Sequence, residues 1–300
     1  MKIRNCFFQA LLPMLAASAT LFSCKPSGEP VKTEVFAFED TTARVSVKVS
    51  AELPADGDGI SIQISEILRH ELDDRLSRVT SYEGERFFDP YKGDPGDQKA
   101  CVKYYFDNLL ALLGRLAQED ADERAAWLEE DAEMTPERKA EILAEMPGWE
   151  YEYSLTKIVD EPAYVVFQSQ DYIYMGGAHG GVGGDGCLTF DKMNGHFVKV
   201  LIDPKNAEAM QPLLTKGLIS YFADAGEQIA EGDLRGYLTL SDEDIIPLPV
   251  WQPYPTKDGL VFTYQQYEVA PYAAGMPSFV LPYAEVEQFL TEDAAKMLRQ

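Results

Sequence analysis

Residues 149–174 read WEYEYSLTKIVDEPAYVVFQSQDYIY, and this stretch decides the fold class. Apolar and polar side chains alternate from Trp149 to Val159 and again from Ala163 to Tyr174. A period of two is typical of a β-strand with one buried face. Because residues 160–162 (Asp-Glu-Pro) favour a turn, the sequence predicts an antiparallel hairpin here.

The sequence before this hairpin predicts one strand and two groups of helices. Residues 43–53 (ARVSVKVSAEL) alternate like a strand, and apolar residues then recur at helical spacing from Ile60 to about Arg78. A second helix is expected around Tyr104–Leu116, continuing into an acidic helical stretch over residues 119–145. Within that stretch, Thr135 and Pro136 have the order of an N-cap followed by the first helical residue.

The sequence after the hairpin predicts more strands in pairs. A glycine-rich loop leads to a strand at 187–191, and a turn at 193–195 (Met-Asn-Gly) leads to another at 196–201. The remaining expectations are a helix over 207–224, strands over 259–269 and 277–281, and a closing helix over 283–299. Hairpins separated by helices predict an α+β fold: a mostly antiparallel sheet of hairpins with packed helices.

The first residues have the pattern of a bacterial lipoprotein signal. Lys2 and Arg4 precede a short apolar run, which ends in Leu-Phe-Ser-Cys at residues 21–24. Residues 1–23 are therefore expected to be a cleaved signal peptide, Cys24 the lipidated first residue, and residues 24–36 a tether. The alternative is a plain secretory signal, which leaves Cys24 an ordinary thiol. The expected location is the cell envelope, lipid-anchored outside the cytoplasm, in the periplasm or on the cell surface.

The composition is strongly acidic. The chain has 50 Asp and Glu against 26 Lys and Arg, a formal net charge of −24 that becomes −26 once residues 1–23 are removed. This charge argues against nucleic acid as a partner, because phosphate binding needs clustered basic side chains. Basic proteins and divalent cations fit the charge better, and solubility alone is the other explanation.

Two cysteines remain after the signal segment, Cys101 and Cys187. In an oxidising compartment they can form one disulfide, and two buried free thiols are the alternative.

The densest cluster of unusual residues lies at 176–186, where glycines surround His179. The spacing matches no phosphate-binding loop, so the main interpretation is structural and the second is a ligand-binding loop. His179, His196 and the nearby acids lack the spacing of a zinc site, and no nucleophile elbow occurs. The sequence therefore predicts no metal site, no cofactor and a non-catalytic protein.

Two segments carry a family resemblance: YMGGAHG at 174–180 and FTYQQYEVAPYAAG at 262–275. Together they resemble the signature segments of the domain of unknown function 3298 (DUF3298) family. The resemblance extends over residues 149–300, and residues 37–148 resemble the usual N-terminal companion of that domain.

The resemblance implies an extracytoplasmic α+β domain. The family also occurs in the lysozyme-binding sigma-V anti-sigma factor and in a peptidoglycan deacetylase. By that resemblance we expect a lipid-anchored module that binds a lysozyme-like protein or a cell-envelope glycan such as peptidoglycan. The alternatives are an envelope hydrolase using His179 and a structural envelope lipoprotein. The candidate ligand-binding residues are Tyr174, Gly176, Gly177, His179, Tyr264, Tyr267 and Tyr272.

Overall fold

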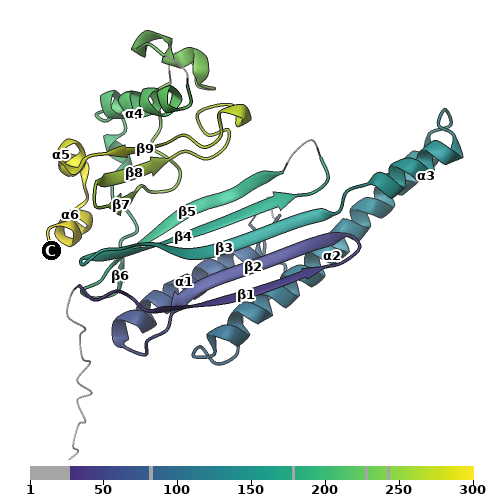
Figure 1. Ribbon diagram of the computed structural model, residues 1–300, viewed down its shortest axis with the longest axis horizontal. Helices are drawn as coiled ribbons and strands as arrows, with labels where there is room; N and C mark the ends of the chain where they lie inside the picture. The colour runs from purple at the N-terminus through teal and green to yellow at the C-terminus, as the bar shows by residue number, and fades with distance from the viewer. Residues whose placement is uncertain (1–27, 81–83, 178–179, 227–228, 242–243) are drawn as a thin grey trace, which may run out of the picture.

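The computed structural model describes residues 28–80, 84–177, 180–226, 229–241 and 244–300. It contains a six-stranded sheet in the order β1-β2-β3-β4-β5-β6 and a three-stranded sheet in the order β7-β8-β9 (Figure 1). The α+β fold class is confirmed. No helix within the described ranges is both long and apolar enough to cross a bilayer.

The six-stranded sheet is built from neighbours in the chain. Its strands are β1 (Thr33–Thr41), β2 (Val45–Pro54), β3 (Trp149–Asp160), β4 (Tyr164–Tyr174), β5 (Gly181–Asp191) and β6 (His196–Phe197). All neighbouring pairs are antiparallel except β2 and β3, which are parallel. A parallel pair needs a long crossover, and here it consists of α1 (Gly59–Ser77), α2 (Gln98–Glu130) and α3 (Pro136–Glu145).

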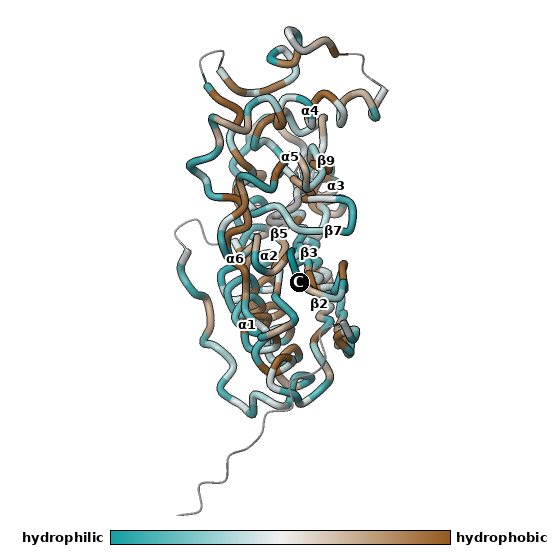
Figure 2. Tube along the Cα trace, turned by 90° about the vertical axis from the view of Figure 1, so that its left-hand side faces the viewer, coloured by the Kyte–Doolittle hydropathy of each residue, from teal (hydrophilic) through white to brown (hydrophobic). Residues whose placement is uncertain are grey.

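One face of this sheet packs against α1 and α2, which Figure 2 shows on one side of β2 and β3. The odd-numbered residues of β2, and those of β3 as far as Leu155, point to this face, as the alternating sequence predicts. We call the result the helix-side core; its members include Val47, Val49, Ala51, Leu53, Leu68, Leu72, Leu109, Tyr151, Tyr153 and Leu155.

The opposite face is covered at one end only. The C-terminal unit, which forms a second core there, contains α4 (Gln211–Asp224), β7 (Tyr254–Thr256), β8 (Gly259–Thr263), β9 (Ser278–Leu281), α5 (Tyr283–Val286) and α6 (Glu292–Leu298). Tyr164 and Val166 of β4 belong to this C-terminal core, whereas Val165 and Phe167 belong to the helix-side core. Figure 1 shows the unit gathered over one end of the sheet, away from the free end of α2.

Several predicted elements are confirmed, and Thr135 caps α3 by accepting from the backbone N–H of Arg138. Others are wrong. Strand β1 was not expected and begins at Thr33, so the predicted tether over 24–36 ends earlier. The glycine-rich segment is a strand from Gly181 onward, because it pairs with β4. The closing helix over 283–299 is broken into short pieces.

The predicted boundary between residues 148 and 149 does not separate two independent units. Strand β2 lies before it and β3 after it, yet the two pair along Val45–Ala51 and Trp149–Leu155. Removing either part would expose the ladder of the other.

Of the two alternatives for Cys101 and Cys187, the disulfide does not form, because the two sulfurs are not bonded to each other. Cys101 is buried in the helix-side core, and Cys187 packs against the C-terminal core. The sheet separates the two cores, so the thiols cannot meet. Burial raises the pKa of the Cys101 thiol to about 11, which keeps it protonated and unreactive at neutral pH.

A buried ionic cluster joins α1, β4 and the C-terminal unit. Arg75 Nε lies 2.8 Å from Glu71 Oε1, and Arg75 Nη1 lies 3.4 Å from Asp171 Oδ1. The Arg75 guanidinium also lies 4.5 Å from the ring centre of Trp251. Trp251 in turn packs on Gly186, where a Cβ would come within 2.6 Å of the ring. Two carboxylates therefore share one buried cation.

This cluster predicts a pH-dependent stability. Burial raises the pKa of Asp171 from 3.8 to about 6, against the opposing effect of Arg75. The folded state then binds more protons than the unfolded state between about pH 4 and pH 6, so stability falls as pH rises through that range. We expect a loss of up to about 3 kcal/mol in the unfolding free energy.

Asp171→Asn should abolish that part of the pH dependence, and Asp258→Asn, at an exposed site, should leave it intact. Urea unfolding between pH 4 and pH 7 measures both variants. An unchanged slope in Asp171→Asn would contradict the assignment.

Candidate functional site

The uncovered end of the sheet displays tyrosine and glutamate side chains. Tyr172 and Tyr174 of β4 lie opposite Glu152 and Glu150 of β3. Their neighbour Ile173 points to the helix-side core, so the tyrosines point to the other face. The helices and strands of the C-terminal unit do not cover them there, and both glutamates are exposed.

The loop between β8 and β9 adds two more tyrosines. The rings of Tyr267 and Tyr272 lie 5.7 Å apart, and Tyr267 is 59% exposed. The loop lies beside the β4–β5 connection, and burial, the charge of Glu150 and the neighbouring Tyr272 together raise the pKa of Tyr172. We call the set Glu150, Glu152, Tyr172, Tyr174, Tyr267 and Tyr272 the tyrosine surface.

A hydrogen bond joins the two segments that carry the family resemblance. Tyr272 Oη donates to the carbonyl oxygen of Gly180, 3.0 Å away. Next along the chain, a Cβ on Gly181 would lie 3.6 Å from Oε1 of Gln266. Segments about 90 residues apart in sequence therefore form one surface.

Tyr267 is held in an unusual backbone conformation. Its φ is +65°, in a region that favours glycine. It occupies the third position of a turn in which the Glu268 N–H donates to the Gln265 carbonyl at 3.1 Å. The Glu268 carboxylate accepts from the backbone N–H groups of Gln265 at 2.7 Å and Val250 at 2.6 Å. These bonds fix the turn and hold Tyr267 outward.

Close contacts explain two of the glycines between β4 and β5. Gly176 has φ +76°, and its carbonyl accepts from Arg124 Nη1 at 3.2 Å. At Gly180 a Cβ would lie 2.1 Å from Tyr172 Oη, so the tyrosine needs glycine there. Tyr174 Oη also donates to the Gly177 carbonyl at 3.2 Å.

The predicted site residues do not all lie together on the surface. Tyr174, Gly176, Gly177, Tyr267 and Tyr272 lie at or beside the tyrosine surface.

Tyr264 is fully buried in the C-terminal core, where its hydroxyl donates to the Pro247 carbonyl at 2.7 Å. It therefore cannot contact a ligand, and this part of the prediction is wrong. His179 lies outside the described residues.

Sequence reasoning missed Tyr172, Glu150 and Glu152. Each occupies the polar or amphipathic position of an alternating strand. Nothing in the sequence, however, indicates that the C-terminal unit leaves this end of the sheet face uncovered. Cross-strand pairing brings these residues beside the predicted tyrosines.

The chemistry of this surface is that of recognition. Tyrosine rings offer apolar faces with a polar hydroxyl, and the carboxylates accept hydrogen bonds and attract cations. Within the part of the chain that the structure describes, no three His, Cys, Asp or Glu side chains are grouped to hold a metal ion.

The conformation of Tyr267 gives a testable order of stabilities. Tyr267→Gly relieves the positive-φ strain that Tyr267→Ala keeps, and both variants lose the same ring contact. We expect the glycine variant to have the higher unfolding free energy, by about 1 kcal/mol.

Gln266 is the matched control, because its φ is not positive. There the alanine variant should be the more stable of the pair. Denaturant unfolding measures all four variants, and a Tyr267→Ala protein at least as stable as Tyr267→Gly would contradict the strained turn.

Comparison with known proteins identifies a family segment in the C-terminal unit. Residues 227–284 match the family model described as "Protein of unknown function (DUF3298)". This range contains Tyr264, Tyr267 and Tyr272 but not residues 174–180, and it covers a smaller part of the chain than the expected 149–300. No curated protein matches the sequence.

Two solved structures are similar to the whole fold. One is a DUF3298 family protein from Pseudomonas aeruginosa PAO1, with 16% identity, a TM-score of 0.55, and 89% of this chain and 97% of that chain covered. The other is a member of the DUF3298 family from Bacteroides fragilis NCTC 9343, with 18% identity, a TM-score of 0.59, and 92% and 100% covered. The chain thus carries a DUF3298 match at residues 227–284 and shares its overall fold with two DUF3298 family proteins.

Proposed function

We propose that this protein is a lipid-anchored, non-catalytic module that binds a basic protein outside the cytoplasm. The observation that carries the proposal is the tyrosine surface, where four tyrosines and two exposed glutamates occupy the uncovered end of the sheet. A partly exposed aromatic cluster beside unburied charge is typical of protein interfaces.

The charge of the surface favours a basic partner. Glu150 and Glu152 are exposed, and Lys48 Nζ lies 3.7 Å from Glu152 Oε1, which leaves an excess of negative charge. The chain as a whole carries −24. Opposite charge speeds encounter and selects among partners, especially at low ionic strength. A lysozyme-like protein has the required charge.

A cell-envelope glycan is the second candidate ligand. Its support is Tyr267, which presents a 59% exposed ring on a fixed turn beside Tyr272. A flat ring with a hydroxyl at its edge suits the apolar faces and hydroxyl groups of a sugar. Peptidoglycan fragments are the natural probe for this candidate.

Binding should depend on the ring of Tyr267. We expect saturable binding to lysozyme at low salt, and Tyr267→Ala should weaken it at least tenfold, the effect of removing an interface aromatic. Tyr267→Phe keeps the ring and should stay within about threefold of the original protein. Trp127→Ala removes another exposed aromatic, 70% exposed on α2, and should change nothing. Calorimetric titration measures all four proteins.

The same titrations separate the competing proposals. Binding to peptidoglycan fragments instead of lysozyme, with the same loss in Tyr267→Ala, would favour the glycan. Turnover of peptidoglycan that disappears in His179→Ala would favour an envelope hydrolase. No saturable interaction with lysozyme or peptidoglycan would overturn both named ligands and favour a structural lipoprotein.

The lipid anchor makes its own prediction. Acyl chains contribute about 0.8 kcal/mol per buried methylene, so a multiply acylated Cys24 would hold the protein on a membrane through high-salt washes. Cys24→Ser should move the protein into the soluble fraction with its fold unchanged, whereas Cys187→Ser should leave it in the pellet. A Cys24→Ser protein that still sediments with membranes would contradict the anchor.

A further inference from the structure

Strand β1 is an open edge of the six-stranded sheet. The Ala55 N–H donates to the Lys32 carbonyl, and the Thr42 N–H donates to the Val45 carbonyl, both at 2.8 Å. These bonds fix which residues of β1 face β2, because hydrogen-bonded pairs alternate along an antiparallel ladder. Glu34, Phe36, Phe38 and Asp40 therefore direct their backbone groups to β2.

The alternate residues direct their backbone groups away from β2. Val35, Ala37 and Glu39 each present an N–H and a carbonyl at this edge, and no described residue bonds to them. All three are exposed, and Val35 is 59% exposed. The strand runs nine residues in unbroken register, with no proline, lysine or bulge to block another strand.

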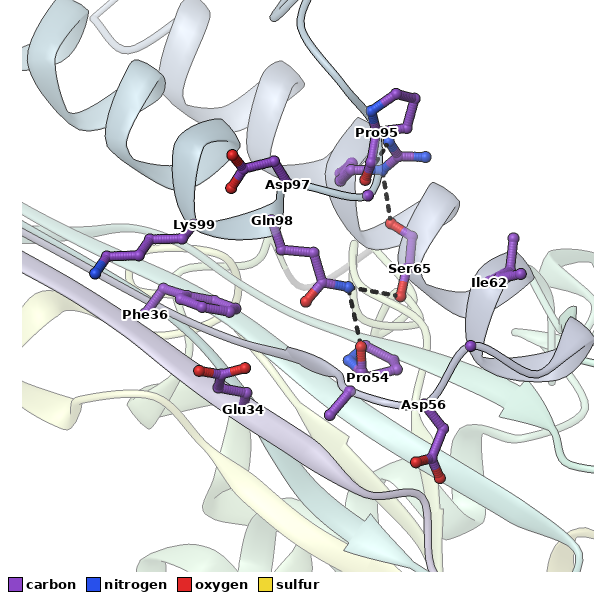
Figure 3. Close-up of a pocket in the computed structure, with 14 residues that line it drawn as sticks. Glu34, Phe36, Pro54, Asp56, Ile62, Ser65, Pro95, Asp97, Gln98 and Lys99 are labelled. Atoms are coloured by element: carbon purple, nitrogen blue, oxygen red, sulfur yellow. Dashed lines mark hydrogen bonds between the residues drawn. The ribbon is translucent and has the colours of Figure 1, made fainter.

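A groove lies beside the first half of this edge, on the helix side of the sheet. Its volume is about 660 Å³, and Figure 3 shows Phe36 and Glu34 of β1 on one wall and the start of α2 on the other. Gln98 reaches across the groove and donates from Nε2 to the Pro54 carbonyl at 2.9 Å. The volume that remains is enough for a long side chain beside Phe36.

The charge of β1 indicates what kind of strand fits. Glu34, Glu39 and Asp40 are exposed along it. The groove is lined by Glu34, Asp56 and Asp97 against Arg69 and Lys99, so acidic side chains outnumber basic ones there too. A second copy of β1 paired about Ala37 would set Glu34 opposite Asp40, which like-charge repulsion disfavours. A strand with lysine or arginine at alternate positions meets the same acids favourably. The aliphatic part of such a basic side chain can pack on Phe36, and its charged end can pair with Glu34.

We propose that β1 receives an extended, lysine- or arginine-bearing segment of a partner protein as an added strand, with one of its basic side chains in the groove beside Phe36. This is strand addition to an open sheet edge, in which the backbone supplies affinity and the side-chain pocket supplies specificity. The β1 edge lies outside the tyrosine surface, so the inference goes beyond the proposed function and does not depend on it.

The test uses a nine-residue peptide in which lysine alternates with valine and threonine, added to the full chain at up to millimolar concentration. Amide hydrogen exchange followed by NMR should show slower exchange at Val35, Ala37 and Glu39. Phe36 and Phe38 already bond to β2 and should change little. A control peptide with glutamate at the lysine positions should not bind.

Two variants separate strand addition from charge alone. Ala37→Pro removes one outward N–H without touching the β2 ladder, and it should weaken peptide binding at least fivefold. Ala37→Ser keeps the N–H and should bind normally. Glu34→Gln keeps the backbone and should weaken binding about threefold if the groove holds the basic side chain.

The outcomes are distinguishable from those of the lysozyme titrations. Tyr267→Ala should bind the peptide normally, because it lies outside this edge. Three results would each overturn the proposal. The first is slower amide exchange in β1 without the alternating pattern, the second is equal binding of the peptide by Ala37→Pro, and the third is unchanged amide exchange at millimolar peptide.

Discussion

The rest of the structure depends on one constraint: the central sheet must bury both faces along part of its length and only one face along the rest. In β4, Val165 and Phe167 enter the helix-side core, while Tyr164 and Val166 enter the C-terminal core. Farther along the same strand, Ile173 still contacts the helix-side core, but the C-terminal core no longer packs on the opposite face. Burial of apolar area stabilises the end of the sheet that lies under the C-terminal core. At the other end, polar and amphipathic residues occupy the exposed face.

The tyrosine surface, which suggests binding, lies where the C-terminal core ends on this face of the sheet. The loop after β8 reaches beyond the C-terminal core, and Tyr272 bonds to the Gly180 carbonyl at that limit. Tyr267 is held there at φ +65° by a turn that the Glu268 carboxylate fixes. A strained, exposed aromatic beside exposed acids is costly for folding alone, which is why we connect it with recognition.

The sequence predicted the elements whose period is regular and whose turns are marked. The 149–174 hairpin and α1 were predictable for that reason. Strand β1 was not, because Val35 and Ala37 are exposed and only Phe36 and Phe38 pack inward. Tyr264 and Tyr267 show the limit at the site: they lie three residues apart, yet the turn reverses the chain between a buried and an exposed position. Alternation cannot predict such a reversal, and only the tertiary fold brings Tyr172 near Tyr272.

Hydroxyl-radical footprinting with mass spectrometry tests the central claim most directly, because it reports which aromatic side chains a bound partner covers. The measurement compares the protein alone with its lysozyme complex at low salt. The account predicts that Tyr267, Tyr172 and Tyr174 lose labelling together, while Trp127 and Phe87, both exposed elsewhere, keep theirs. Protection of Trp127 or Phe87 with unchanged labelling of Tyr267 would contradict it.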